Sequence, residues 1–259
     1  MRSAMRRFEE ILGAIGLGRA ISPIGEALRG GKALRQSQRM REFYAALLPK
    51  GALVFDIGAN VGTMTRIFAS LGARVIAVEP NPDCARHIEL STRRGQVEVL
   101  AAAVSDRDGQ AVLKVSDRKD KMSTLSNEWR EAVSRENAEY AGMWKREMTV
   151  STMTLDGLIQ RYGRPFYIKI DVEGYEERAV RGLSQCPSLL SFEFNRVFLE
   201  PALKALESAV FDDAMFNYTL IDPVRFELED WVDRNELKKA ILELEEGRGL
   251  GDVFVRRRE

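Results

Sequence analysis

Short apolar runs alternate with helical stretches along the chain from residue 52 onward. The apolar runs predict strands at residues 52–57, 74–79, 97–104, 166–172, 189–194, 217–221 and 252–255. Several of them are apolar at successive positions, which is typical of strands buried on both faces of a parallel sheet. Helix signals lie between them; Asn81, for example, is a predicted N-cap followed by proline at the first helical position. This order predicts an α/β fold with a doubly wound sheet.

The N-terminal segment differs from the rest of the chain in charge and in pattern. Residues 1–41 hold nine Lys/Arg and three Asp/Glu, and apolar residues recur at helical spacing at Phe8, Ile11, Leu12 and Ile15. We expect a basic helical segment over residues 1–45, with the helix ending before the glycines around Gly16 and Gly30, and a main domain over residues 46–259. The helix is expected to pack on the main domain; binding at a membrane surface is the alternative.

A charge-dense segment interrupts the strand pattern at about residues 114–147. It follows a predicted hairpin at Asp106–Gly109, and we expect a helix in its second half. An insertion of this kind in an α/β protein is either a lid over the functional site or a surface excursion without a role in it. The sequence leaves both interpretations open.

Composition excludes several chemistries. The chain has 259 residues, 39 Lys+Arg against 39 Asp+Glu, one histidine (His87) and two cysteines (Cys84 and Cys186). These are too few ligands for a Cys/His zinc site, and any nucleophile–histidine triad would depend on His87 alone.

Zero net charge argues against nucleic acid as a partner, and no apolar run approaches the roughly 20 residues of a transmembrane helix. We therefore expect a cytoplasmic protein, with peripheral membrane contact through the basic helix as an option; the sequence does not predict the oligomeric state.

The most informative motif follows the first predicted strand. It is a D-x-G-x-x-x-G pattern formed by Asp56, Gly58 and Gly62, with Ala59 and Asn60 in the turn. A dinucleotide fingerprint needs G-x-G-x-x-G, and Asp56 would repel a pyrophosphate, although it would attract an ammonium group. Glu79 closes the second strand, where an acid can accept both hydroxyls of a ribose. A ligand with an amine, a sulfonium, an adenine and a ribose fits both acids, and S-adenosylmethionine has all four groups.

Several further motifs appear in the order of a known family. FDIGANVGTMT, AVEPNP, AAAVSDRDG, MSTLS, TLDGLI, IKIDVEGYE and DVFV resemble the FkbM family of S-adenosylmethionine-dependent methyltransferases over roughly residues 50–255. The resemblance implies a class I methyltransferase (Rossmann-like) fold, with a seven-stranded sheet whose last strand is antiparallel, and methyl transfer to a hydroxyl oxygen of a sugar or natural product. It also implies that Asp56, Gly58, Ala59, Asn60 and Gly62 surround the methionine end of the cofactor. Glu79 would then hold the ribose, and Asn81 would lie near the adenosine. Many class I methyltransferases have an aspartate for the adenine after the third strand, where this chain has Ala103, so backbone groups and apolar contact would hold the adenine instead.

A second charged cluster ends the fourth predicted strand. Lys169, Asp171 and Glu173 alternate along it, so they lie on one side of the strand until the turn intervenes. Ligands of open α/β sheets bind at the carboxyl ends of the strands, where the first and fourth strands are usually neighbours. The alternative is an ion pair between Lys169 and Asp171 that only orders the loop.

Methyl transfer to a hydroxyl requires a group that removes the proton. Asp171 is the first candidate for the base, and Glu173 and Glu193 are the next. Lys169 would orient these acids or stabilise a developing alkoxide. No metal ligand set is predicted, although several carboxylates together leave a divalent ion possible.

Three functions from different classes follow. The favoured one is an S-adenosylmethionine-dependent methyltransferase acting on a hydroxyl of a sugar, glycan or secondary metabolite, with a small-molecule or glycan acceptor as the partner. The second is a nicotinamide-dependent oxidoreductase on a similar sheet. The third is a noncatalytic module that binds the cofactor without turnover.

Overall fold

A large sheet carries the predicted strands. The computed structural model describes residues 23–116, 123–136, 140–221, 224–244 and 249–258, with side chains from residue 35 onward. The sheet consists of β1 (Leu53–Ile57), β2 (Arg74–Val78), β3 (Val97–Leu100), β8 (Tyr167–Ile170), β9 (Leu189–Asn195), β10 (Ala214–Leu220) and β11 (Leu250–Arg257). Within the described ranges its order is β10-β11-β9-β8-β1-β2-β3, and β11 runs antiparallel to both of its neighbours. The predicted doubly wound sheet with an antiparallel last strand is confirmed, and so is the predicted neighbourhood of the first and fourth strands, β1 and β8.

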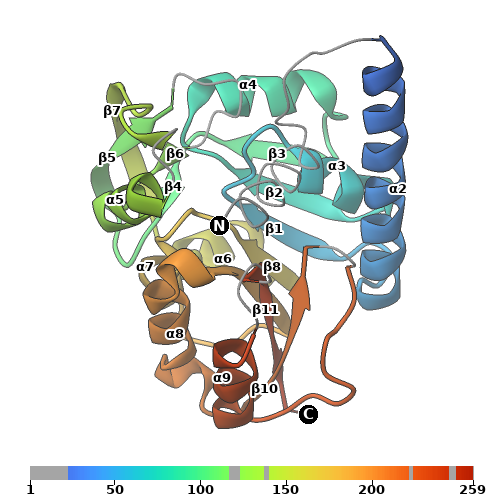
Figure 1. Cartoon of the computed structure of the whole chain (residues 1–259), viewed down its shortest axis with the longest axis vertical. Coiled ribbons are helices and arrows are strands. Elements are labelled where there is room, and N and C mark those ends of the chain that lie inside the picture. Colours follow the sequence, from blue (N-terminus) through green and yellow to red (C-terminus); the bar gives the residue numbers. More distant parts are fainter. Residues whose placement is uncertain (1–22, 117–122, 137–139, 222–223, 245–248, 259) are drawn as a thin grey trace.

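Helices cover both faces of this sheet (Figure 1). They are α2 (Pro23–Leu47), α3 (Thr63–Ser70), α4 (Pro82–Ser91), α6 (Leu155–Tyr162), α7 (Glu176–Arg181), α8 (Glu200–Leu206) and α9 (Arg234–Leu242), with short 3-10 turns at Arg196–Phe198 and Ala209–Phe211. The helix α4 begins as predicted, because the Asn81 side chain accepts a hydrogen bond from the backbone N–H of Asp83. His87 is exposed on α4, as expected for a surface residue, and Cys84 and Cys186 are free and buried.

Strand alternation makes the two faces of the sheet different. One face is apolar along its whole length: Phe55 and Ile57 of β1 pack there with residues from α6, α7, α8 and α9. On the opposite face Val54 packs with Tyr44 of α2 and Phe68 of α3, whereas Asp56, two residues further along the same strand, is polar. The polar positions of this second face therefore gather toward the carboxyl ends of the parallel strands.

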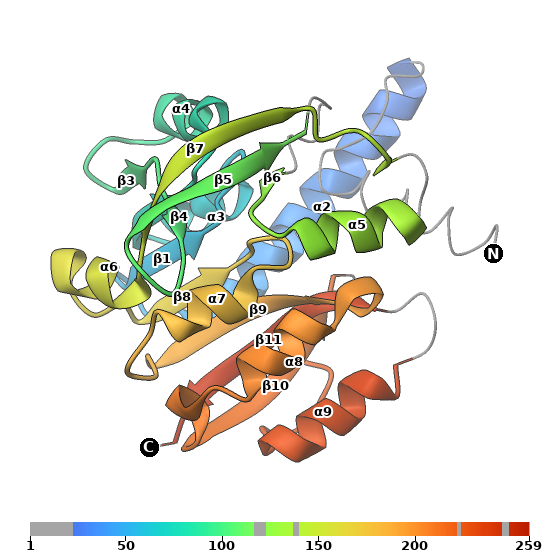
Figure 2. The ribbon, with the colours of Figure 1, turned by 90° about the vertical axis from the view of Figure 1, so that its left-hand side faces the viewer.

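A smaller sheet corrects two predictions. It contains β4 (Ala103–Val104), β5 (Gly109–Val115), β6 (Ser123–Thr124) and β7 (Arg146–Met153), in the order β4-β7-β5-β6. The predicted strand 97–104 is divided, because the chain leaves the large sheet after Leu100 and Ala103–Val104 pairs with β7. The predicted hairpin at Asp106–Gly109 is wrong: β7 lies between β4 and β5 and pairs with both. Figure 2 shows β5 and β7 side by side.

The insertion is built differently from the expectation. Its helix α5 (Asn127–Glu136) lies in the middle of the segment, and the end of the segment enters β7 at Arg146. Long-range pairing with β5 decides the conformation of β7, which is why local pattern did not indicate a strand there. In Figure 1, α5 and the smaller sheet lie on the opposite side of the molecule from α2.

The N-terminal segment contains a helix further along the chain than expected. The predicted helix around Phe8–Ile15 lies outside the described residues. The helix α2 continues through Gly30 and Gly31, which we expected to follow the end of a helix. Glycine in a helix interior costs about 1 kcal/mol relative to alanine, and the packing of Tyr44 and Phe43 on the large sheet stabilises the C-terminal part of α2.

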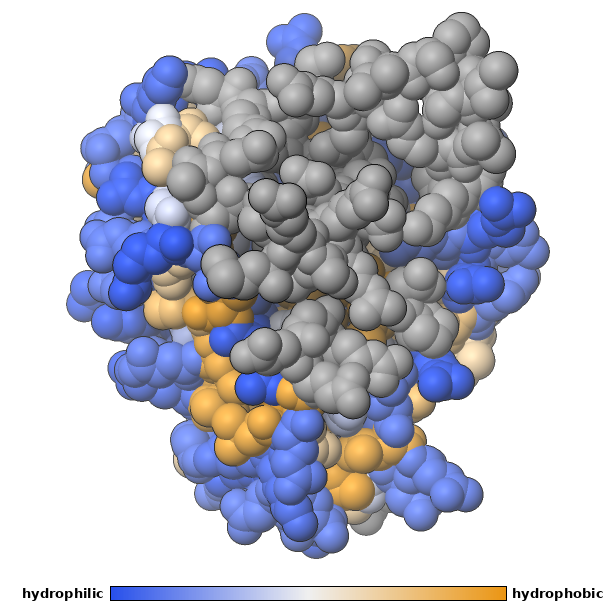
Figure 3. All heavy atoms as spheres, in the orientation of Figure 1, coloured by the Kyte–Doolittle hydropathy of each residue, from blue (hydrophilic) through white to orange (hydrophobic). Residues whose placement is uncertain are grey.

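The described surface is mostly hydrophilic on the face shown in Figure 3, with apolar side chains gathered where Figure 1 places α7 and α8. Among the described residues, no helix is both long enough and apolar enough to cross a lipid bilayer.

Candidate active site

The loop after β1 needs glycine for a steric reason. Gly58, Asn60 and Gly62 all have positive φ, at 78°, 49° and 79°. The backbone N–H groups of Gly58 and Ala59 both donate to the carbonyl oxygen of Val78. A Cβ atom on Gly58 would lie 1.8 Å from the carbonyl oxygen of Asp171, so any side chain there would collide with the end of β8. The loop after β1 and the loop after β8 are therefore in direct contact.

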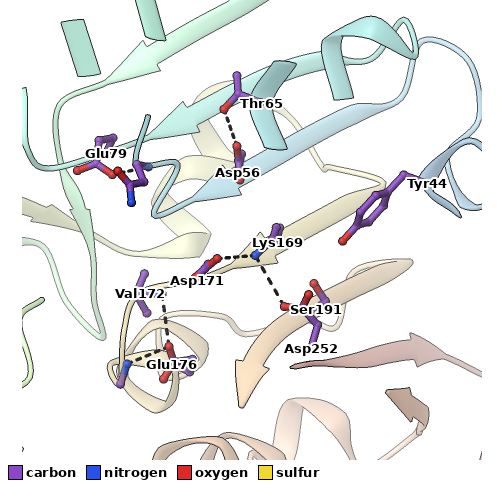
Figure 4. A network of polar contacts seen from close by, with 12 residues as sticks. Tyr44, Asp56, Thr65, Glu79, Lys169, Asp171, Val172, Glu176, Ser191 and Asp252 are labelled. Carbon is purple, nitrogen blue, oxygen red and sulfur yellow. Dashed lines mark hydrogen bonds and ion pairs between the residues drawn. The ribbon is translucent and has the colours of Figure 1, made fainter. Parts of the chain in front are cut away.

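Asp56 is a buried acid at the end of β1. It is 2% exposed and accepts a hydrogen bond from Thr65 Oγ1 at 2.5 Å (Figure 4). Burial raises the pKa of Asp56 to about 6, although the Thr65 hydrogen bond and the charge of Lys169 act in the opposite direction. A cation at this position would compensate the burial of the carboxylate.

Glu79 organises the loop after β1 from the end of β2. Its carboxylate accepts hydrogen bonds from the backbone N–H groups of Asn60, at 2.7 Å, and Asn81, at 2.8 Å. Burial raises the pKa of Glu79 to about 7 against the effect of these two bonds. Each carboxylate oxygen has about two acceptor sites, so Glu79 keeps capacity for two further donors, such as a pair of vicinal hydroxyls.

Lys169 is a buried cation with two acidic neighbours. It is 5% exposed, and its Nζ lies 2.8 Å from Asp171 Oδ2 and 3.7 Å from Asp252 Oδ1 (Figure 4). Burial alone would lower the pKa of Lys169, but Asp171, Asp252 and Tyr167 raise it well above its ordinary value. Lys169 therefore stays an ammonium ion at neutral pH. In the sheet Lys169 is the register partner of Asp56, so the two charged clusters lie on adjacent strands.

The turn after Asp171 is held from two sides. Glu173 adopts a φ of 53°, and its carbonyl oxygen accepts a hydrogen bond from Thr124 Oγ1 at 2.8 Å. A Cβ atom on Gly174 would lie 2.5 Å from Cβ of Trp129, so the helix α5 packs directly against this turn. On the other side the Glu176 carboxylate accepts from the backbone N–H of Gly174, at 3.1 Å. Burial raises the pKa of Glu176 to about 7.

Glu193 projects from β9 into the same region. Burial, followed by the charges of Asp171 and Glu173, raises the pKa of its carboxyl group well above the ordinary value. Mutual repulsion of carboxylates therefore characterises this part of the site.

A cavity of about 500 Å³ lies over the carboxyl ends of the parallel strands. Sheet order divides its lining into two parts. The β1–β3 half contains Asp56, Gly58, Ala59, Asn60, Glu79 and Ala103, and the β8–β11 half contains Lys169, Asp171, Glu173, Glu193 and Asp252. The structure thus brings most of the predicted site residues to one cavity. Gly62 and Asn81 do not line it: Gly62 is the N-cap of α3 and Asn81 is the N-cap of α4.

Sequence reasoning missed several residues of this cavity. Asp252 was part of the predicted last strand, but only the antiparallel pairing with β9, which places it opposite Glu193, brings it to Lys169. Trp129 and Tyr140 line the cavity from the insertion, and Tyr44 lines it from α2. Glu176 does not line the cavity, but it accepts from the backbone of the turn that carries Glu173; its position in the same charged motif was the signal that could have identified it.

Within the described ranges, no cluster of three or more His, Cys, Asp or Glu side chains is arranged to hold a metal ion.

The strand order and the acids at the ends of β1 and β2 define a class I methyltransferase fold. The model of the methyltransferase FkbM domain matches residues 56–218, and the chain therefore belongs to this family, as its motifs indicated.

Known proteins resemble the chain to different degrees. The hexuronic acid methyltransferase AglP of Haloferax volcanii is 28% identical over 144 residues, which cover 54% of this chain and 53% of that protein. The chain thus matches about half the length of this curated relative. Among solved structures, the magnesium protoporphyrin IX methyltransferase of Synechocystis PCC 6803 has a TM-score of 0.47 at 11% identity, covering 98% of this chain and 91% of the other. An O-methyltransferase of Thermotoga maritima has a TM-score of 0.42 at 15% identity, with 85% and 66% covered.

Proposed function

We propose that the protein transfers the methyl group of S-adenosylmethionine to a hydroxyl oxygen of a sugar, glycan or secondary metabolite. The observation that carries the proposal is the pairing of β1 with β8, which places Asp56 and Lys169 in register at the boundary between the two halves of the cavity. A cofactor in the β1–β3 half and an acceptor in the β8–β11 half would meet at this boundary.

The β1–β3 half fits S-adenosylmethionine by its donor and acceptor groups. Glu79 has acceptor capacity for the two ribose hydroxyls, and Asp56 suits the ammonium group of the methionine end. Ala103, Leu113 and Leu125 give the adenine an apolar environment. When bound, the cofactor supplies a methyl group on a positively charged sulfonium.

The β8–β11 half has the groups that an acceptor hydroxyl requires. A bond forms between the acceptor oxygen and the methyl carbon as the sulfur–carbon bond breaks, and the hydroxyl proton passes to a base. We assign this base to Asp171, with Glu173 and Glu193 as the neighbouring acids. Lys169, held as an ammonium ion at 2.8 Å from Asp171 Oδ2, orients this carboxylate and stabilises negative charge on the acceptor oxygen. Positioning of the two reactants along one line supplies a further part of the rate.

Family membership and the relative's activity support this proposal. The chain belongs to the methyltransferase FkbM domain family, and the Haloferax volcanii relative is named as a methyltransferase of a hexuronic acid, which is a sugar derivative. A sugar-like acceptor is consistent with the many polar side chains of the β8–β11 half.

Calorimetric titration tests the cofactor assignment. We expect saturable binding of S-adenosylmethionine and no saturable binding of NAD, because Asp56 disfavours a pyrophosphate. Asp56→Asn, which keeps the shape of the side chain, should weaken S-adenosylmethionine binding about tenfold through loss of the ammonium's partner. Asp213→Asn changes an exposed acid away from the cavity and serves as the control. Saturable binding of NAD alone would exclude the proposed function in favour of the oxidoreductase.

The affinity for S-adenosylmethionine should rise with pH. The pKa values of Asp56 and Glu79 are raised to about 6 and about 7, so both acids lose their protons between pH 5.5 and 7.5 and become able to attract the cationic cofactor. We expect the dissociation constant to fall by about tenfold over this range. Titrations across this pH range, in buffers of different ionisation enthalpy, measure both the affinity and the protons released. A pH-independent affinity would contradict the roles of these two acids.

The stability of the unliganded protein should change in the opposite direction. Acids with raised pKa values hold protons in the folded state, so the free energy of unfolding decreases as pH rises from about 4.5 to 7.

A further inference from the structure

We propose that Glu176 is a positioning residue for the methyl transfer, because its buried carboxyl group holds the turn after β8 that presents Asp171, the assigned base, to the cavity. Glu176 itself does not line the cavity, so it acts through Asp171 and does not touch the substrate. The inference rests on the proposed function and adds one residue to its mechanism.

The turn after β8 has a backbone conformation that depends on its surroundings. Glu173 and Gly174 have φ values of 53° and 85°, so two successive residues lie in the left-handed region. A residue with a Cβ persists there only when the surrounding structure determines its conformation, and such residues gather at functional sites. Among the described residues, Asn60 and Glu173 are the non-glycine residues with positive φ, and both line the cavity. The groups that hold Glu173 in this conformation therefore also shape the site.

One oxygen of Glu176 binds this turn at two points. Its Oε1 accepts hydrogen bonds from the backbone N–H groups of Val172, at 3.3 Å, and Gly174, at 3.1 Å (Figure 4). Val172 and Gly174 flank Glu173 in the chain, so a single carboxyl oxygen fixes the backbone on both sides of it.

The backbone of Asp171 is held on both sides as well. Its own N–H donates to the carbonyl oxygen of Ile57 at 2.9 Å, and the peptide bond that follows it donates to Glu176. Glu176 is the first residue of α7, whose Ala179 and Val180 are fully buried in the core on the apolar face of the large sheet. The carboxyl group of Glu176 therefore connects Asp171 to a firmly packed helix.

A carboxyl group at this position is unfavourable unless it has a task. Glu176 is 3% exposed, and burial raises its pKa to about 7. An apolar side chain of the same size would avoid this penalty, but it would remove the acceptor of the Val172 and Gly174 N–H groups. Since one oxygen accepts both bonds, the other can carry a proton without loss of either contact. The turn therefore requires an acceptor oxygen at this position and does not require a negative charge.

Two substitutions separate the oxygen from the charge. Glu176→Gln keeps Oε1, and Glu176→Met keeps the length of the side chain but removes the acceptor oxygen. With labelled S-adenosylmethionine and methyl glucoside or methyl glucuronide as acceptor, we expect Glu176→Met to lower kcat by about 10²-fold, the effect of a misplacement of about 1 Å, and Glu176→Gln to stay within about threefold of the wild type. The affinity for S-adenosylmethionine, measured by calorimetry, should not change in either variant. A large loss of kcat in Glu176→Gln, or none in Glu176→Met, would overturn the inference.

Leu206→Ala controls for a general loss of stability. Leu206 is fully buried on α8 and does not line the cavity, so its truncation destabilises the fold without touching the turn. Its kcat should equal that of the wild type at a temperature at which both are folded. An equal loss of kcat in Leu206→Ala and Glu176→Met would assign Glu176 a structural role only and overturn the inference.

A double variant tests whether Glu176 acts through Asp171. Once Asp171→Asn has removed the base, the position of this side chain no longer limits the reaction, so adding Glu176→Met should lower kcat little further. Independent effects of about 10³-fold and about 10²-fold would instead multiply to about 10⁵-fold, and such a loss would contradict a positioning role for Glu176.

Amide hydrogen exchange separates this inference from the proposed function, because it needs no acceptor. The N–H groups of Val172 and Gly174 should exchange about tenfold faster or more in Glu176→Met than in the wild type, and Glu176→Gln should keep their protection. Unchanged exchange in Glu176→Met would overturn the inference whatever the turnover. A wild type that methylated neither sugar would contradict the proposed sugar acceptor, and the exchange rates would then decide alone whether Glu176 holds the turn.

Discussion

Asn in place of Asp171 is expected to lower kcat by about 10³-fold, within the usual contribution of a general base. Asparagine keeps the size of the side chain and an oxygen that can accept a hydrogen bond from Lys169, but it cannot take the proton of the acceptor hydroxyl. The affinity for S-adenosylmethionine should change little, because Asp171 belongs to the β8–β11 half of the cavity and Glu79 and Asp56 face the cofactor. Steady-state kinetics and calorimetry measure the two effects separately.

Asp252→Asn is the matched control for this prediction. It removes a negative charge from the other side of Lys169, 3.7 Å from Nζ, and leaves the 2.8 Å contact with Asp171. We expect its effect on kcat to be much smaller. If both variants lowered kcat equally, Asp171 would act by holding Lys169 and the base would be another group. Unchanged turnover in Asp171→Asn would remove Asp171 from the mechanism.

Gly58→Ala is expected to disrupt the junction between β1 and β8. The added Cβ would lie 1.8 Å from the carbonyl oxygen of Asp171, which is backbone and cannot move away as a side chain would. The φ of 78° adds strain for any L-residue with a Cβ. Together we expect a loss of about 3 kcal/mol in the free energy of unfolding. S-adenosylmethionine binding should also be strongly weakened, since the same movement displaces the loop that carries Asn60.

Gly51→Ala separates the cost of the positive φ from the cost of the steric collision with Asp171. Gly51 has the same φ of 78°, and a Cβ there would meet no atom within 4 Å. This variant should cost about 1 kcal/mol, from backbone strain alone. Urea unfolding of both variants gives the difference, which is the cost of the contact with Asp171. If the two variants were equally stable, the close approach of the two loops would not exist in solution.

The insertion contributes to the site more than its sequence suggests. Thr124 donates to the carbonyl oxygen of Glu173, and Trp129 packs against Gly174 and lines the cavity. These contacts favour a role at the site over a surface excursion. The segment therefore supports the turn of the charged cluster.

The sequence by itself determined the sheet, the family and the two motifs that build the site. Apolar runs at β1, β2, β8 and β9 are buried in any register, so local pattern is sufficient to predict them. The motif around Asp56 and the charges at Lys169 and Asp171 follow directly after such strands, and the carboxyl ends of parallel strands meet at one edge. For these residues, the position in the sequence was sufficient to predict their place at the carboxyl edge of the sheet.

Only the tertiary structure decided the remaining contacts, because they depend on pairing between distant segments. Asp252 reaches Lys169 through the antiparallel register of β11 with β9, and β7 becomes a strand because it pairs with β5. The sequence predicted β1 and β8 as neighbours but not their register, and this register brings Gly58 next to Asp171. Burial in the folded protein then determined the pKa values of the acids at the site. The sequence placed acids at Asp56, Glu79 and Glu193, but their raised pKa values come from desolvation first and then from the charge of neighbouring acids, Asp171 in all three cases. Both effects exist only once the sheet has brought the side chains together.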